Sequence, residues 1–239
     1  WGILVSTILL LLVKEDAFIY VISIGMYFLS QKRFNLTGKT KQWLILTEFL
    51  LPLLYFTLAL LILSTFGEGG MVSRFDAFLL KDENGILAVF KNLVLHPSFA
   101  ISHLFMAKKL GYLFLMLAPM CFLPLLQRNW STYFLALPLV VINLLPDWPY
   151  QYDIGFQYSY GSGALLFIMA LLALEDLKLH KHINEKMVIS FIFVGMIFSG
   201  TILHRLTQSW SFNIGYYQQN KEKFEAIKYG LEILPEDAS

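Results

Sequence analysis

The chain alternates between long charge-free stretches and short polar segments. A transmembrane helix needs about 20 predominantly apolar residues to cross a hydrocarbon layer about 30 Å thick, and unpaired backbone groups exclude irregular structure in lipid. Stretches without a charged residue occur at 49–67, 110–127, 129–146, 154–174 and 187–203. Together with their flanking residues, they predict membrane spans at 43–66, 109–127, 131–146, 160–175 and 187–205.

Residues 1–31 form a separate pattern of two shorter apolar runs. The runs 1–13 and 17–31 flank three consecutive charged residues, Lys14, Glu15 and Asp16. As a helix of about 14 residues, the second run rises only about 21 Å. We therefore expect a broken helical hairpin whose charged bend lies at or just below the membrane surface.

The charges in the polar segments predict the orientation of these spans. Segment 31–42 carries Lys32, Arg33, Lys39 and Lys41 and no acidic residue, so the positive-inside rule places it on the cytoplasmic side. Counting spans onward places 127–131 and 176–186 on the same side, and each carries net positive charge. The outer side then holds the bend at 14–16, the loop 67–108, the segment 147–160 and the tail 206–239.

Two outer segments contain helical patterns of their own. Apolar and charged residues alternate at helical spacing over 78–95, which predicts a helix lying in the membrane interface. In the tail, Phe224, Ile227 and Leu231 have the spacing of an amphipathic helix, which we interpret as the entrance to a truncated soluble domain. We expect an all-α fold: a polytopic transmembrane helical bundle over 1–205, with short or broken helices, followed by an extracytoplasmic tail.

The composition is that of a membrane protein, which we expect in the cytoplasmic membrane of the cell, and it excludes a soluble domain and a nucleic-acid-binding protein. Hydrophobic residues make up 57% of the 239 positions and charged residues 15%, against about 45–50% and about 25% in soluble domains. The net charge of +1 provides no basic surface for nucleic acid, so the lipid bilayer is the expected partner. The single cysteine, Cys121, cannot form an intrachain disulfide. No metal ligands are assigned, because His96 and His103 have no cysteine partner.

The charged bend has two readings. Lys14, Glu15 and Asp16 form either a hairpin turn with an internally neutralised charge pair or a binding site at the membrane surface. In the second reading Lys14 binds a phosphate, because lysine is a point-charge partner for phosphate. One carboxylate would then orient Lys14, and the other would be available for a divalent metal or a hydroxyl group.

The segment "LLPDWPYQYDIGFQYSYGSG" (144–163) is the second candidate. It concentrates carboxylates, amides and aromatic rings directly before a span, with Asp147, Tyr150, Gln151, Asp153, Gln157 and Tyr158 as candidate ligand-binding residues. Aromatic residues at a membrane boundary are commonly interfacial anchors. Rings interleaved with carboxylates and amides also suit a carbohydrate site, in a re-entrant loop that lines a cavity.

The order of these features resembles a bacterial family of multi-spanning membrane proteins, domain of unknown function 2079. The resemblance lies in the "KED" bend, "HPSFAISHLFMAKKLGYLFLMLAPMCFLPLL", "NLLPDWPYQYDIGFQYSYGSGALLF" and the closing "LEILPEDAS". It covers nearly the whole chain but only the central and C-terminal part of such a protein, which implies a missing N-terminal part. Many relatives have a histidine before the tyrosine where this chain reads Gln157-Tyr158, so a general base is not expected there.

That family is distantly similar to the C-type glycosyltransferases, which use polyprenol-phosphate sugars on the extracytoplasmic face. The similarity implies that the catalytic carboxylate lies in a first outer loop, upstream of Trp1. This chain would then supply a lysine for the lipid phosphate and an aromatic loop for the sugar.

Three functions follow from these patterns. The first is an enzyme that transfers a sugar from a polyprenyl-phosphate donor to an outer acceptor, with Lys14 on the phosphate and the residues of 147–158 on the sugar. The second is a transporter or permease, which would place acidic residues near the bilayer midplane and commonly contains inverted repeats. The third is a non-catalytic membrane scaffold for an outer domain, in which the bend and the aromatic loop would point in unrelated directions.

Overall fold

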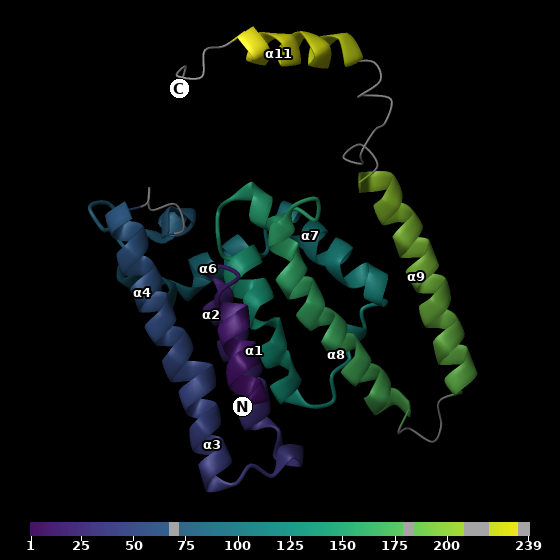
Figure 1. The fold of residues 1–239 in the computed structure, drawn as a ribbon. Coiled ribbons are helices and arrows are strands. Elements are labelled where there is room, and N and C mark those ends of the chain that lie inside the picture. The colour runs from purple at the N-terminus through teal and green to yellow at the C-terminus, as the bar shows by residue number, and fades with distance from the viewer. Residues whose placement is uncertain (67–71, 179–183, 208–219, 234–239) are drawn as a thin grey trace. The chain divides into compact units, whose positions relative to one another are not determined.

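A computed structural model describes residues 1–66, 72–178, 184–207 and 220–233 (Figure 1). These residues form helices and turns and no β-strand, which confirms the all-α prediction. The chain divides into two units, residues 1–200 and 201–239. The glycine cluster at 67–71 and parts of the expected outer tail lie outside the described residues.

The first unit begins with the expected broken hairpin. Helix α1 (Gly2–Leu11) is followed by the charged bend and by α2 (Ala17–Ser30). Helix α2 is central to the bundle, because it packs against α1, α4 and the 3-10 segment η6 (Trp130–Ala136). The hydroxyl of Ser23, which is wholly buried in α2, donates a hydrogen bond to the backbone oxygen of Phe134 in η6.

The longest helix combines α3 (Gly38–Ile45), the π-helical turn η2 (Leu46–Leu50) and α4 (Leu51–Phe66). Within η2, the carboxylate of Glu48 is buried and accepts a 2.7 Å hydrogen bond from the hydroxyl of Thr7 in α1. A Cβ atom at Gly25 would lie 2.5 Å from the Cβ of Glu48. Glycine at this position therefore allows α2 to pack directly against the π-helical turn.

Two of the expected spans are not continuous α-helices. The region 109–127 divides into α7 (Ala107–Leu117), η4 (Ala118–Met120) and η5 (Leu123–Leu125), because Cys121 and Phe122 adopt φ angles of 50° and 57°. The region 131–146 consists of η6 and the π-helical segment η7 (Leu139–Leu144). Prolines within or beside these segments favour such interruptions, since each removes a backbone donor.

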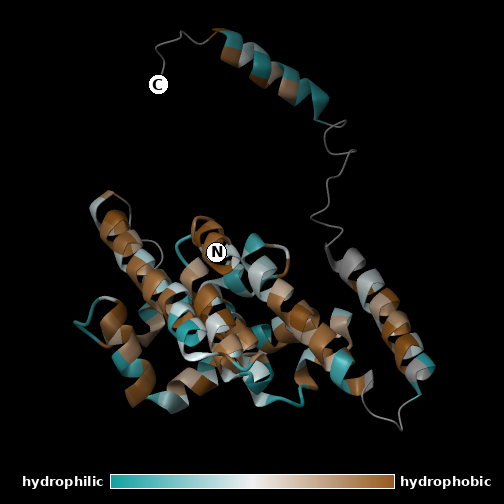
Figure 2. Cartoon of the chain, turned by 60° about the horizontal axis from the view of Figure 1, so that its bottom comes forward, coloured by the Kyte–Doolittle hydropathy of each residue, from teal (hydrophilic) through white to brown (hydrophobic). Residues whose placement is uncertain are grey.

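Helices α8 (Tyr160–Lys178) and α9 (Glu185–Thr207) follow. Among the described residues, two helical stretches, Gly38–Leu63 and Gln157–Leu177, are long and apolar enough to cross a membrane. A third is obtained if Pro97–Leu104 and Ala107–Met120, which meet at a 59° bend, form one broken span. Apolar residues cover much of these stretches in Figure 2, and the remaining expected spans are shorter apolar helices.

Polar segments expected on the cytoplasmic side lie together at one end of the first unit. The side-chain amide of Asn129 donates a 2.9 Å hydrogen bond to the amide oxygen of Gln31. The guanidinium of Arg33 lies 3.9 Å from the carboxylate of Glu175 and donates a 2.6 Å hydrogen bond to the hydroxyl of Tyr27. The cytoplasmic orientation of this end stays a prediction.

The loop after α4 contains η3 (Val72–Phe78), α5 (Ile86–Leu95) and α6 (Pro97–Leu104). Helix α5 buries Val89 and Asn92 and exposes Leu87, Phe90 and Val94. This amphipathic division is the one expected of a helix in the membrane interface. In the second unit, α11 (Lys221–Ile233) mixes hydrophilic and hydrophobic residues (Figure 2).

Glu83 ties the turn before α5 to that helix. Its carboxylate accepts a 2.8 Å hydrogen bond from the Lys91 ammonium and a 2.5 Å bond from the Asn92 amide. These bonds, that of Lys91 first, lower the pKa of Glu83 from 4.5 to about 2. Because folding lowers this pKa, the stabilisation is present above the unfolded value and is lost as the pH falls from 4.5 toward about 2.

We therefore expect amide hydrogen exchange over residues 79–92 to accelerate as the pH falls through this window, after correction for the intrinsic exchange rate. Glu83→Gln should abolish this acid dependence, whereas Glu222→Gln in α11 should leave it unchanged. An unaltered acid dependence in Glu83→Gln would contradict the assignment.

Candidate functional site

The aromatic loop, residues 147–159, consists of short turns that buried side chains hold in place. It contains η8 (Pro149–Tyr152) and η9 (Gln157–Ser159). The wholly buried amide of Asn143 donates hydrogen bonds of 2.7 Å and 3.0 Å to the backbone oxygens of Gln151 and Tyr158. Ser162 in turn donates a 2.6 Å hydrogen bond to the amide oxygen of Asn143. One asparagine on η7 therefore fixes both turns of the loop.

Lys109 of α7 anchors the start of the same loop. Its ammonium is fully buried and donates hydrogen bonds to the backbone oxygens of Leu144 (2.5 Å) and Pro146 (3.1 Å). It also lies 5.2 Å from the centre of the Tyr152 ring. Burial raises the pKa of Tyr152, and the nearby Asp147 carboxylate raises it further, so this phenol stays neutral beside the lysine. The Lys109 ammonium therefore serves to hold the loop backbone.

Four rings of the loop form an aromatic cluster: Trp148, Tyr150, Phe156 and Tyr158. Trp148 makes edge-on contacts with Tyr150 and Tyr158, with ring centres 5.3 Å and 5.2 Å apart. Tyr150 meets Phe156 at 4.5 Å. Edge-to-face pairs of this kind favour a fixed ring geometry.

The charged bend meets this cluster. The ammonium of Lys14 lies 4.6 Å from the centre of the Tyr158 ring, and it donates a 2.7 Å hydrogen bond to the buried carboxylate of Asp16. The cation thus has a carboxylate and a ring face as partners. Two segments that are far apart in the sequence therefore supply one polar centre.

Arg74 of η3 brings a second cation to the same rings. Its guanidinium carbon lies 4.3 Å from the centre of the Trp148 ring and 5.4 Å from that of Tyr158. The backbone of Asp147 donates a 2.9 Å hydrogen bond to the backbone oxygen of Arg74, which holds η3 against the loop. Sequence reasoning did not assign Arg74 to the site, because only the ring contacts distinguish it from other loop arginines.

A cavity of about 520 Å³ lies between the charged bend, α2 and the start of α8. This volume is within the usual range of small-molecule sites, about 300–1,000 Å³. The apolar lining comes mainly from Leu10, Val13, Ala17, Ile24, Ala164 and Leu165, and the polar lining from Lys14, Asp16, Tyr20, Gln157, Tyr158 and Tyr160. The site is therefore an apolar cavity with one paired cation.

The other predicted site residues do not line this cavity. Glu15 is half-buried beside it, and Tyr150 lies in the aromatic cluster. Gln151 is buried, with its side-chain oxygen unpaired, and Asp153 accepts a 2.8 Å hydrogen bond from the backbone of Gly155. The Asp147 carboxylate is half-exposed and lies 4.0 Å from the buried Nε2 atom of His103. The structure thus brings Lys14, Asp16, Gln157 and Tyr158 together, and their roles in binding stay predictions.

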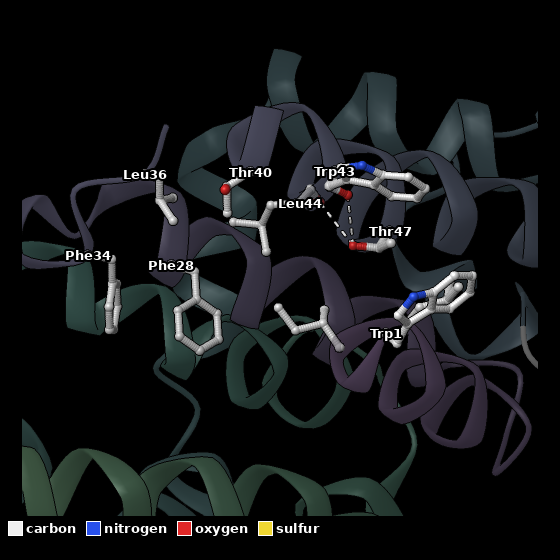
Figure 3. Close-up of a pocket in the computed structure, with 10 residues that line it drawn as sticks. Trp1, Phe28, Phe34, Leu36, Thr40, Trp43, Leu44 and Thr47 are labelled. Atoms are coloured by element: carbon white, nitrogen blue, oxygen red, sulfur yellow. Dashed lines mark hydrogen bonds between the residues drawn. The ribbon is translucent and has the colours of Figure 1, made fainter. Parts of the chain in front are cut away.

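Within the part of the chain that the structure describes, no three histidine, cysteine, aspartate or glutamate residues are grouped so that they could hold a metal ion. A second cavity of about 540 Å³ lies at the opposite end of the α1–α2 hairpin (Figure 3). Its lining contains no charged side chain. Of these two cavities, the one beside Lys14 is therefore the better candidate for polar chemistry.

Helices long and apolar enough to cross a bilayer, and a polar loop held among them, define a helical membrane protein. The chain belongs to the family described as "Predicted membrane protein (DUF2079)", whose sequence profile matches residues 1–233. This match confirms the family resemblance found in the sequence. Comparison with curated proteins and with solved structures finds no match.

We expect Asn143→Ala to unfold the aromatic loop locally, because it leaves two loop carbonyls without their donor. An orphaned buried polar group costs about 1–3 kcal/mol. The thermal midpoint should fall by several degrees, and quenching of tryptophan fluorescence by iodide should increase as Trp148 is released. Gln42→Ala, which truncates an exposed amide on α3, is the matched control. Parent-like quenching in Asn143→Ala would refute this anchoring role.

Proposed function

We propose that this protein is a glycosyltransferase-like membrane enzyme that uses a polyprenyl-phosphate-linked sugar on the extracytoplasmic face. The proposal rests above all on one observation. A cation that is paired with a buried carboxylate stands against an aromatic ring at the edge of an apolar cavity. A lipid-linked sugar phosphate needs these three features: a cation for phosphate, rings and amides for the sugar, and apolar walls for the isoprenoid.

Lys14 and Arg74 are the proposed phosphate-binding residues. Both lie on the Tyr158 ring, so they are no farther apart than the sum of their distances to its centre, 4.6 Å and 5.4 Å. An arginine that stacks on a ring keeps the edges of its guanidinium available for paired hydrogen bonds to phosphate. The two cations would hold the phosphate before and after transfer.

The sugar would lie against the aromatic cluster. Within this cluster, Tyr150 is exposed and Tyr158 is half-buried. Tyr158 and the exposed amide of Gln157 both line the cavity beside Lys14. Asp147, Gln151 and Asp153 belong to the same loop and complete the proposed sugar-binding set. Of these three, Asp147 has the most accessible carboxylate and is the best placed to reach a hydroxyl group.

In the transfer, the acceptor hydroxyl oxygen forms a bond to the anomeric carbon of the sugar. The bond from that carbon to the phosphate oxygen breaks, and its electron pair leaves with the lipid phosphate. The hydroxyl proton passes to a general base, which we do not assign to a residue of this chain. Asp16 already holds Lys14, and Glu15 has no further candidate ligands grouped with it among the described residues, so no divalent metal enters this proposal.

The two alternative functions fit less well. A scaffold predicts a bend and an aromatic loop that point in unrelated directions, whereas Lys14 contacts Tyr158 at 4.6 Å. A transporter is favoured by one observation, the carboxylate of Glu48 buried within the longest apolar helix. Glu48, however, does not line the cavity beside Lys14. The polar residues of that cavity belong to segments at one end of the α1–α2 hairpin, the end opposite Trp1, whereas a transporter needs them near the middle of the membrane.

The proposed orientation is tested by chemical labelling. In a Cys121→Ser background, a cysteine at Lys41 should react with a membrane-impermeant maleimide only after the cells are opened. A cysteine at Lys228 in α11 should react in intact cells, because the tail is proposed to be extracytoplasmic. The reverse pattern would place the cavity on the cytoplasmic side and exclude an outer-face enzyme.

The proposed chemistry is tested by removing each cation in turn. We expect Lys14→Gln and Arg74→Gln each to reduce transfer about 10- to 100-fold, the value of one charged hydrogen bond to phosphate. Asp153→Ala should weaken sugar use. Lys81→Gln and Arg128→Gln are the matched controls, and envelope glycans measured by mass spectrometry are the readout. Normal insertion with parental glycan profiles in Lys14→Gln and Asp153→Ala would exclude this enzyme.

A further inference from the structure

The second cavity lies between the free ends of the α1–α2 hairpin and α3, so Lys14 and this cavity are at opposite ends of α1. Figure 3 shows Phe34 and Leu36 at one end of the cavity and Trp1 and Trp43 at the other. Thr40, Leu44 and Thr47 contribute from the same face of α3 and η2.

The lining offers contacts to hydrocarbon. The hydroxyl of Thr47 is used within its own helix, where it donates a 3.0 Å hydrogen bond to the backbone oxygen of Trp43. Trp1, Ile3 and Trp43 are exposed at the opening, with 98%, 55% and 61% of their surface accessible. Exposed apolar side chains of this kind favour contact with hydrocarbon. A volume of about 540 Å³ is enough for one flexible chain of methylene groups.

Basic side chains lie next to residues that line the cavity, and one of them, Arg33, also lies 3.9 Å from the carboxylate of Glu175. Lys39 and Lys41 flank Thr40 on α3, and both are exposed. The guanidinium of Arg33 lies 5.0 Å from the centre of the Phe34 ring, which lines the cavity. Segment 31–42 contains no acidic residue. The cavity therefore combines an apolar interior with the exposed ammonium groups of Lys39 and Lys41 beside Thr40.

We propose that this cavity binds one acyl chain of an anionic phospholipid, whose headgroup phosphate lies against Lys39 and Lys41. Basic groups beside a gap between membrane helices favour anionic headgroups. Hydrocarbon contacts alone would accept any phospholipid, so the choice of an anionic lipid comes from charge complementarity. This inference does not depend on the proposed enzymatic activity.

The test uses the full chain, exchanged in detergent against an equimolar mixture of phosphatidylglycerol and phosphatidylcholine with identical acyl chains. Lipids retained by the protein are counted by native mass spectrometry. The parent should be enriched in phosphatidylglycerol. Since each lysine near an anionic surface contributes about 1 kcal/mol, about fivefold, the variant Lys39→Gln/Lys41→Gln should lose most of this enrichment.

A second variant tests the cavity itself. Thr40→Trp should fill the cavity and reduce retention of both lipids, whereas Thr57→Trp, on an exposed turn of α4, should not. Lys223→Gln/Lys228→Gln in α11 is the charge-matched control. Unchanged thermal midpoints show that the variants are folded.

Three results would overturn the proposal. The first is equal retention of the two lipids by the parent. The second is phosphatidylglycerol enrichment that persists in both Lys39→Gln/Lys41→Gln and Thr40→Trp. The third is a second copy of the chain that is bound to the parent and is lost in Thr40→Trp. The last result would assign the cavity to self-association.

Discussion

The site depends on the hydrogen bonding of non-helical backbone within an apolar bundle. A buried carbonyl without a donor costs about 1–3 kcal/mol, so a buried non-helical segment persists only where protein groups replace water. Asn143 and Lys109, neither of which is accessible, satisfy four carbonyls of the segment from Leu144 to Tyr158. Their polar atoms are occupied by this task. The residues that shape the site are thus different from those that we propose contact a ligand.

Once the loop is fixed, its rings position the cations. Lys14 and Arg74 come from segments that precede the loop by many residues, and the face of Tyr158 is the surface that both contact. Cation–π contacts contribute about 0.5–2 kcal/mol, depending on how far they are desolvated. They leave the hydrogen-bonding capacity of the cation largely free. Such cations can therefore bind and release a phosphate without losing the contacts that position them.

Much of the fold could be predicted from the sequence, because apolar length and charge are local properties. These predicted the all-α class and the hairpin break at Lys14 to Asp16, whereas the family was identified by the resemblance of longer motifs. The break at Cys121 and Phe122 and the π-helical turn around Glu48 could not be predicted, since neighbouring helices select them. For the site, the sequence indicated the bend and the loop but missed Arg74 and the anchoring role of Lys109. Those roles depend on partners distant in the sequence.

The two ends of the α1–α2 hairpin contain similar kinds of side chains, but we propose different functions for them. Each end has an apolar cavity, aromatic residues and basic side chains. Near Trp1, Lys39 and Lys41 are exposed, so salt screens their charges and they select only for the sign of a headgroup. Near the bend, Asp16 and Tyr158 hold Lys14 in one position. Preorganised charge is what stabilises a developing negative charge during a reaction. We therefore propose phosphate binding at the bend and lipid selection at the other end.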